Sequence, residues 1–111
     1  MTFDYTITFS TTSVQLSAAI PAYYRKAYNN ASARWVSLQC DPANTHVVYV
    51  GGNNHGIDVS SSSYGIILPL PPSNVPAAPL IINFSPAQSL DLSQFWVNGT
   101  NGEKLHVFVV L

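Results

Sequence analysis

The chain has 111 residues, the usual size of one compact domain, so we expect a single domain over residues 1–111. Only 8% of the residues are charged and the four Lys and Arg residues are scattered, which argues against nucleic acid as a partner. No apolar run approaches the ~20 residues that cross a bilayer, so we expect no membrane span.

Short alternations of apolar and polar residues dominate the chain and indicate β-strands. The first such segment, residues 3–9, alternates aromatic or aliphatic side chains with Asp and Thr. Residues 14–18 alternate again after a polar turn, so we expect the two segments to pair as a hairpin. Residues 19–33 are less regular; Pro21 permits a helix start, and we expect a loop with at most one helical turn.

The middle of the chain contains two clearer strands. Residues 34–40 alternate loosely and end at Asp41-Pro42-Ala43-Asn44, a turn signal, because proline fixes φ and Asp or Asn hydrogen-bonds nearby backbone. Residues 46–50 are mostly β-branched or aromatic, which predicts a central strand buried on both faces. Gly51-Gly52 ends this strand.

The second half continues the same pattern of strands and turns. A short edge piece is expected at residues 57–59 and a strand at 65–68. Residues 69–79 form a proline-rich extended loop, because the prolines favour polyproline geometry and exclude a central strand. Further strands are expected at residues 80–84, 89–93, 95–97 and, after a turn at 98–102, at 104–110.

This arrangement predicts an all-β fold. Many short strands, separated by turn signals roughly every 8 to 12 residues, are typical of a single-domain antiparallel β-sandwich, jelly-roll-like, or of a small barrel. Helices that alternate with strands would indicate a parallel sheet, and the sequence pattern does not show this alternation.

Common catalytic and cofactor motifs are missing from the sequence. The serine run at residues 60–63 lacks the G-x-S-x-G frame of a nucleophile, and Gly51-Gly52 lacks a phosphate-binding frame. Cys40, the only cysteine, is expected to be a small buried hydrophobe. The three histidines share no short ligand motif: His46, His55 and His106. We therefore expect no enzymatic activity, no metal and no cofactor.

Three features predict contacts with other proteins: the low charge of the chain, the tyrosine cluster at residues 23–28 and the proline-rich segment at residues 69–79. Interface centres are poor in charge and rich in aromatics, and aromatic residues beside Arg are typical anchors. A proline-rich loop is already stiff and therefore costs little to order. Packing of the tyrosines on the domain's own core is the alternative. The candidate interface residues are Tyr23, Tyr24, Arg25, Tyr28, Pro71, Pro72, Val75 and Pro76.

Several sequence marks beyond Arg34 form a pattern. The turn at residues 41–44 leads into V-Y-V-G-G at 48–52, and L-D-L-S at 90–93 precedes G-x-x-G-E-K at 99–104. With these marks, residues 34–111 resemble small structural proteins of bacteriophage virions. The resemblance implies a capsid decoration (cement) protein that binds the outer capsid surface and stabilises the shell. A neck, tail or fibre component of the virion is the alternative.

The same resemblance implies the partners and the location. The partners would be the major capsid protein and neighbouring copies of the chain, with a homotrimer favoured. The first residues lack the regions of a signal peptide, so we expect synthesis in a host cytoplasm and a place in the virion.

A function of another class stays open: a carbohydrate-binding β-sandwich that stacks sugars on Tyr or Trp, with Trp35 or Trp96 as the platform.

Overall fold

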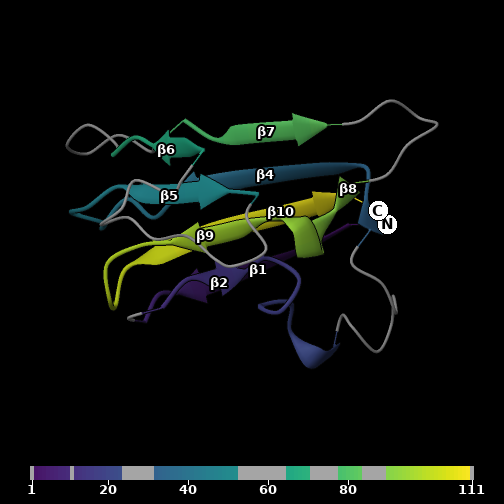
Figure 1. Cartoon of the computed structure of the whole chain (residues 1–111), viewed down its shortest axis with the longest axis horizontal. Coiled ribbons are helices and arrows are strands. Elements are labelled where there is room, and N and C mark those ends of the chain that lie inside the picture. Colours follow the sequence, from purple (N-terminus) through teal and green to yellow (C-terminus); the bar gives the residue numbers. More distant parts are fainter. Residues whose placement is uncertain are drawn as a thin grey trace.

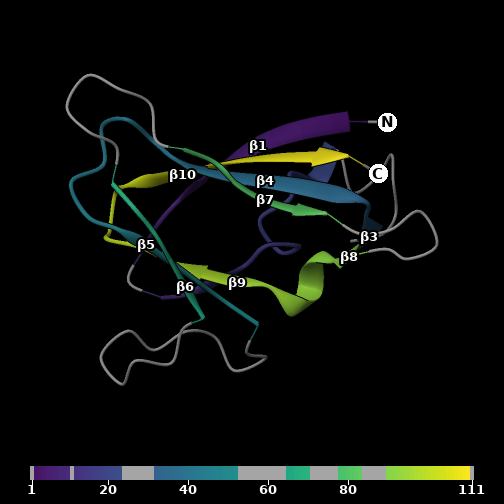
Figure 2. The same cartoon turned by 90° about the horizontal axis from the view of Figure 1, so that it is seen from above.

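Two antiparallel four-stranded sheets, β1-β10-β4-β7 and β2-β9-β5-β6, form the two layers of a sandwich (Figures 1 and 2). The computed structural model describes residues 2–10, 12–23, 32–52, 65–70, 78–83 and 90–110. The strands are β1 (Thr2–Thr8), β2 (Val14–Gln15), β3 (Ser32–Ala33), β4 (Trp35–Cys40), β5 (Val48–Gly51), β6 (Ile66–Leu68), β7 (Leu80–Asn83), β8 (Leu90–Asp91), β9 (Trp96–Asn98) and β10 (Lys104–Val110), and η1 (Leu92–Gln94) is a 3-10 helix. The all-β prediction is confirmed as a sandwich, because no pairing among these strands joins the two large sheets into a closed barrel.

The strand pairing follows one rule along the described chain. The first strand pairs with the last, the second with the second to last, and so on inward: β1–β10, β2–β9, β3–β8, β4–β7 and β5–β6. Two further pairings, β10–β4 and β5–β9, join these pairs into the two sheets. A single long hairpin rolled over on itself gives this order, which is the strand order of a jelly roll.

The predicted hairpin of the first two strands is wrong. β1 alternates as predicted, but it pairs with β10, whereas β2 belongs to the opposite sheet and is only two residues long. Phe9 follows β1 in the inward phase and is buried, and its N–H still donates to the Glu103 carbonyl oxygen at 2.9 Å. Across the core, the hydroxyl of Tyr5 donates to the carbonyl oxygen of Leu16 at 2.9 Å. The chain therefore crosses between sheets here and does not reverse within one.

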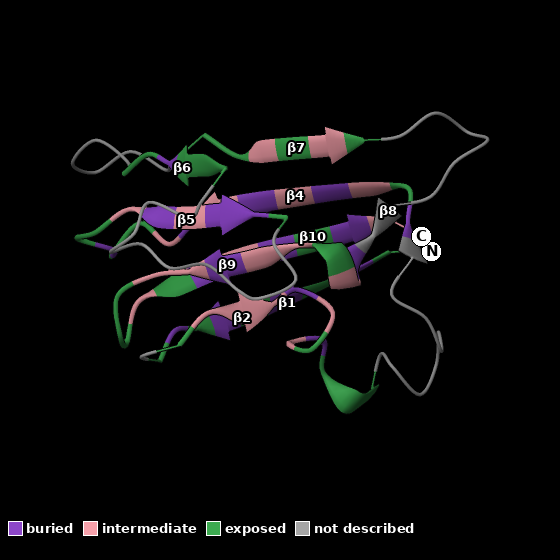
Figure 3. Ribbon diagram, viewed as in Figure 1, coloured by how far each residue is buried: buried purple, intermediate pink, exposed green. Residues whose placement is uncertain are grey.

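The hydrophobic core lies between the two layers and is built from the inward phase of the long strands (Figure 3). β4 and β10 alternate buried and more exposed residues along their whole length. Cys40 belongs to this core, which confirms the prediction of a small buried hydrophobe. The fully buried side chains include Phe9, Leu16, Val36, Leu38, Val48, Leu92, Val97, Leu105, Val107 and Val109.

Two other strand predictions need correction. β5 is an internal strand with Val48 and Val50 buried, but Tyr49 is only half-buried, so the strand is not buried on both faces. The segment predicted as a strand at residues 89–93 has only the two-residue β8, after which the chain turns into η1. Leu92 is buried at this turn, so its apolar character reflects core packing of a 3-10 helix. The predicted edge piece at residues 57–59 lies outside the described residues.

Candidate functional site

Of the predicted interface residues, the structure describes Tyr23 alone. Its side chain is 77% exposed, so this tyrosine does not pack into the core. The others lie outside the described residues: Tyr24, Arg25, Tyr28, Pro71, Pro72, Val75 and Pro76.

One side of the sandwich exposes large apolar side chains. β6 and β7 are the last strands of their sheets and lie on the same side of the molecule (Figure 1). Residues 65–70 and 78–83 include no charged residue, and we call them the uncharged edge. Along the whole sequence between Asp58 and Asp91 there is no Asp, Glu, Lys or Arg. Four apolar residues of this edge are 38–50% exposed: Ile66, Ile67, Leu70 and Ile81.

The opposite edge of the β1-β10-β4-β7 sheet is built differently. Edge strands present unpaired backbone groups, and monomeric β proteins usually protect them with charges or keep them short. β1 carries Asp4 on its outer face between exposed threonines, and the edge strand β2 of the other sheet has only two residues. Within the described residues, the uncharged edge has no charge, and the outward pair of β7 is Ile81 and Asn83, so this is the less protected side of the sandwich.

The turn after β4 is fastened to the start of β10 by polar side chains. The Asn44 amide donates to the carbonyl oxygen of Lys104 at 2.8 Å, and its oxygen accepts from the Lys104 N–H at 3.0 Å. Asp41 accepts from the N–H of Ala43 at 2.8 Å, which confirms the predicted self-capping turn. Two sequence marks that lie far apart, residues 41–44 and 99–104, therefore meet at one end of the sandwich. Their residue types serve this structural contact.

Two carboxylates of this end are held in their charged form. The pKa of Asp41 lies below its usual value because the carboxylate accepts hydrogen bonds from the Ala43 N–H and from His106. Burial by itself would raise the pKa of Glu103, but hydrogen bonds from Thr45 and His46 outweigh it and lower the pKa below the usual value. Both groups therefore favour the folded state when they are ionised.

The two lowered pKa values predict a loss of stability in acid. A carboxyl group with a lowered pKa in the folded state contributes stability above its unfolded pKa, and this contribution is lost as the pH falls through the folded value. The unfolded values are 3.8 for Asp41 and 4.5 for Glu103, so we expect the free energy of unfolding to decrease below about pH 4.5. Urea denaturation at a series of pH values measures this. Glu103→Gln should lower stability by about 1 kcal/mol at pH 7 and flatten the acid dependence; an unchanged pH profile would contradict the assignment.

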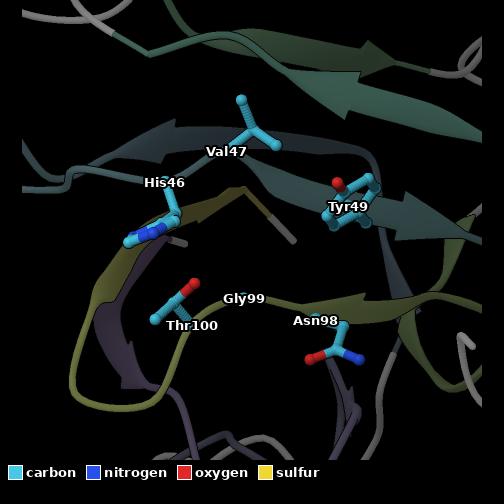
Figure 4. A pocket seen from close by; sticks show the side chains of 6 residues that line it. All are labelled: His46, Val47, Tyr49, Asn98, Gly99 and Thr100. Carbon is cyan, nitrogen blue, oxygen red and sulfur yellow. The ribbon is translucent and has the colours of Figure 1, made fainter. Parts of the chain in front are cut away.

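A hollow of about 260 Å³ lies on the outer face of the β2-β9-β5-β6 sheet. Figure 4 shows His46, Val47 and Tyr49 on one side, with residues 98–100 on the other. Gly99 is one of the lining residues and lies against the ring of Phe9, since a Cβ atom at this position would come within 2.5 Å of that ring. Most of the surface that lines this hollow is apolar. The need for glycine at position 99 is explained by its close contact with Phe9 in the core.

A second hollow of about 260 Å³ lies on the outer face of the β1-β10-β4-β7 sheet. Strand register brings its side chains together in two rows across three strands. Asp4, Phe108 and Ser37 form one row, and Thr6, His106 and Gln39 form the next. The sequence reasoning did not find this group. Phe108 was the available signal, because it stands in the outward phase of the strand whose inward phase is Leu105, Val107 and Val109.

The tryptophans proposed as sugar platforms are both half-buried. The ring of Trp35 packs edge-on against Phe108 at a centroid distance of 5.8 Å and an interplanar angle of 82°. The Nε1 atom of Trp96 is buried and has no hydrogen-bond partner among the described residues. Among the described aromatic residues on the outer face of the β1-β10-β4-β7 sheet, Phe108 is the exposed one, at 42%.

Three side chains linked by successive contacts have the residue types of a hydrolase triad: Asp41, His106 and Thr6. Asp41 Oδ2 lies 2.7 Å from His106 Nε2, and His106 Nδ1 lies 3.1 Å from Thr6 Oγ1. Acyl transfer also needs N–H donors that converge on a developing oxyanion. Thr6 and His106 are opposite each other on a sheet face, where backbone N–H groups lie in the plane of the sheet and do not point above the hydroxyl. Within the described part of the chain, this arrangement connects the turn to β10, and its two sheet strands direct no backbone N–H group at the Thr6 hydroxyl.

Other chemistry finds little support in the described part of the chain. Burial raises the pKa of the Cys40 thiol, which disfavours the reactive thiolate. Among the residues that the structure describes, no three His, Cys, Asp or Glu side chains are grouped to hold a metal ion. The same residues include no helix of the length and hydropathy that a membrane span requires.

Comparisons with known proteins do not assign the chain to a family. No family model, no curated protein and no solved structure matches it.

Proposed function

We propose that this chain is a structural protein of a bacteriophage virion that decorates the outer capsid surface and stabilises the shell. The uncharged edge carries the proposal. Proteins that stay monomeric usually protect their edge strands, and here both β6 and β7 present isoleucines, with no charged residue in the described ranges 65–70 and 78–83. The resemblance of residues 34–111 to small virion proteins supplies the kind of assembly.

A partner at the uncharged edge would bury surface that is costly to leave in water. A stable interface buries about 800 Å² on each partner, and each Å² of apolar surface contributes about 25 cal/mol. The exposed residues Ile66, Ile67 and Ile81 are the anchors that we propose for this contact. On the side away from β4, β7 pairs with no described strand, so its backbone would offer hydrogen bonds to an added strand and fix the orientation of the partner.

The proposed partners are the major capsid protein and neighbouring copies of this chain. A homotrimer is the favoured form, because it matches a three-fold position of a shell. Many equivalent sites on one particle would then add their binding through avidity. A neck, tail or fibre component would use the same edge in an assembly of different symmetry.

The experiment is a change of charge on the edge. We expect the double variant Ile67→Lys, Ile81→Lys to remain folded, because both side chains are about half exposed, and to lose binding to capsids that lack the protein, measured by co-sedimentation. The contact would bury the new lysines without an opposite charge, and the free-energy cost of removing them from water opposes binding. Light scattering over a concentration series should show the same loss of the oligomer.

The control adds the same charges elsewhere. Thr2→Lys, Thr12→Lys places two lysines at exposed positions at the β1 side of the molecule, and capsid binding should stay at the level of the unchanged protein. Equal loss of binding in both double variants would reject the uncharged edge as the interface. Full binding by the Ile67→Lys, Ile81→Lys variant would do the same.

A further inference from the structure

We propose that the outer face of the β1-β10-β4-β7 sheet binds a neutral sugar residue in the hollow beside Phe108. This site lies on a sheet face and goes beyond the proposed contact with a capsid. We call it the sheet hollow and define it by Asp4, Thr6, Ser37, Gln39, His106 and Phe108.

The first element of the sheet hollow is an exposed aromatic ring in a fixed position. Phe108 is 42% exposed although it lies in the middle of the internal strand β10. The ring of Trp35, from the next outward row, packs edge-on against it. Aromatic rings prefer this geometry, and the contact limits the rotation of Phe108. The protein therefore holds one ring face ready for an apolar surface.

The second element is space beside the ring. Ser37 stands opposite Phe108 in the register of β4 and β10, and Ile81 stands opposite Ser37 on β7. The short side chain of Ser37 leaves room beside Phe108, and the depression there has a volume of about 260 Å³. Pockets that enclose drug-sized ligands have about 300–1,000 Å³, so the sheet hollow suits one small ring and not an extended ligand.

The third element is a polar rim of side chains. The carboxylate of Asp4 has no hydrogen bond or ion pair within the described residues, and it stands directly opposite Phe108. Gln39 and Ser37 add amide and hydroxyl groups from β4. His106 is held by Thr6 and Asp41 through its two ring nitrogens, so it forms a fixed wall. A carboxylate can accept two hydrogen bonds from neighbouring hydroxyl groups of one ligand.

These elements together select the chemical class of the ligand. A sugar ring has an apolar C–H face that packs on an aromatic ring and hydroxyl groups that need donors and acceptors. Among the described residues, no Lys or Arg lines the sheet hollow, and Asp4 would repel an anion. A purely apolar ligand would cover the Asp4 carboxylate without a hydrogen bond, which is costly. The neutral, polyhydroxylated ring of a hexose satisfies all three conditions.

The test is an NMR titration of the ¹⁵N-labelled protein with the methyl glycosides of glucose, galactose, mannose and N-acetylglucosamine. We expect at least one of them to give saturable shifts with a dissociation constant on the order of 1 mM, centred on β1, β10 and β4. Glucuronic acid and glucose 6-phosphate should bind about 10-fold more weakly or not at all, because of Asp4. Absence of saturable shifts for all four glycosides at ~50 mM would overturn the proposal, and so would shifts centred elsewhere or tighter binding of the charged sugars.

Variants separate the sugar platform from the fold. Phe108→Ala should weaken binding about 10-fold or more, whereas Phe108→Tyr, which keeps the ring, should retain it. Thr8→Ala changes an exposed residue of the same sheet face that does not line the hollow, and this variant should bind like the unchanged protein. The amide spectrum of each variant shows whether it is folded. Unchanged affinity in Phe108→Ala would reject the site.

The outcome is independent of the proposed capsid contact. Failure of the sheet hollow would leave sugar binding absent and capsid binding still sensitive to Ile67→Lys, Ile81→Lys. Failure of the capsid proposal would leave capsid binding insensitive to these changes, with sugar binding still dependent on Phe108.

Discussion

Leu105→Ala is expected to lower the free energy of unfolding by about 2–5 kcal/mol, the usual cost of a large cavity in a packed core. Leu105 has no exposed surface and lies on β10, which pairs with β1 on one side and with β4 on the other. Its neighbours in register, Ile7 and Cys40, are buried as well. Because a domain of this size has a total stability of about 5–15 kcal/mol, the variant loses a large part of it. Urea denaturation followed by circular dichroism gives the value.

Phe108→Ala is the control on the same strand. Its side chain is 42% exposed and points to the outer face, so we expect its stability loss to stay at about 1 kcal/mol, mainly from the contact with Trp35. Equal losses for Leu105→Ala and Phe108→Ala would contradict the assignment of inward and outward phases along β10.

Asn44→Ala is expected to destabilise the protein by about 1–3 kcal/mol. Asn44 is 9% exposed, and its amide completes the hydrogen bonds of the Lys104 backbone. Without it, the N–H of Lys104 loses its partner, and the carbonyl oxygen of Lys104 keeps only the hydrogen bond from the Asp41 N–H at 3.2 Å. An unsatisfied, partly buried backbone donor is more costly than the average lost hydrogen bond. Thermal or urea denaturation measures the change.

Asn101→Ala makes the same chemical change in an exposed turn. Asn101 lies in the turn before β10 and is exposed, so we expect a change within about 0.5 kcal/mol. Similar losses for the two asparagines would show that the side-chain bonds of Asn44 do not carry stability.

The sequence was informative where local pattern decides the structure. The alternation in residues 3–9 and 104–110 predicted β1 and β10 closely, because each has one face in the core and one in solvent. The glycine-containing turn before β10 was also predicted, and Gly102 has a φ of 86°, which favours glycine. Local pattern says nothing about the partner of a strand, however. β1 and β2 are neighbours in sequence but belong to different sheets.

The sheet hollow was out of reach for the same reason. Asp4, Ser37 and Phe108 come from three distant parts of the chain, and only the register of β1, β10 and β4 places them in one row. The uncharged edge depends on which strands end up at the border of a sheet. The sequence shows that residues 59–90 include no charged residue, but it does not show that β6 and β7 lie at the borders of their sheets.

The mirror-like pairing of the strands has a consequence for how the protein is made. Of the described strands, β10 leaves the ribosome last, and both β1 and β4 need it as a neighbour. Until it emerges, β1 has no hydrogen-bonded partner strand and one sheet is divided into β1 and the pair β4–β7. Contacts between the ends of a chain are slow to form because a long loop must close first. The nascent chain therefore exposes apolar strand surface until β10 has emerged, which makes this stage of translation the most sensitive to aggregation.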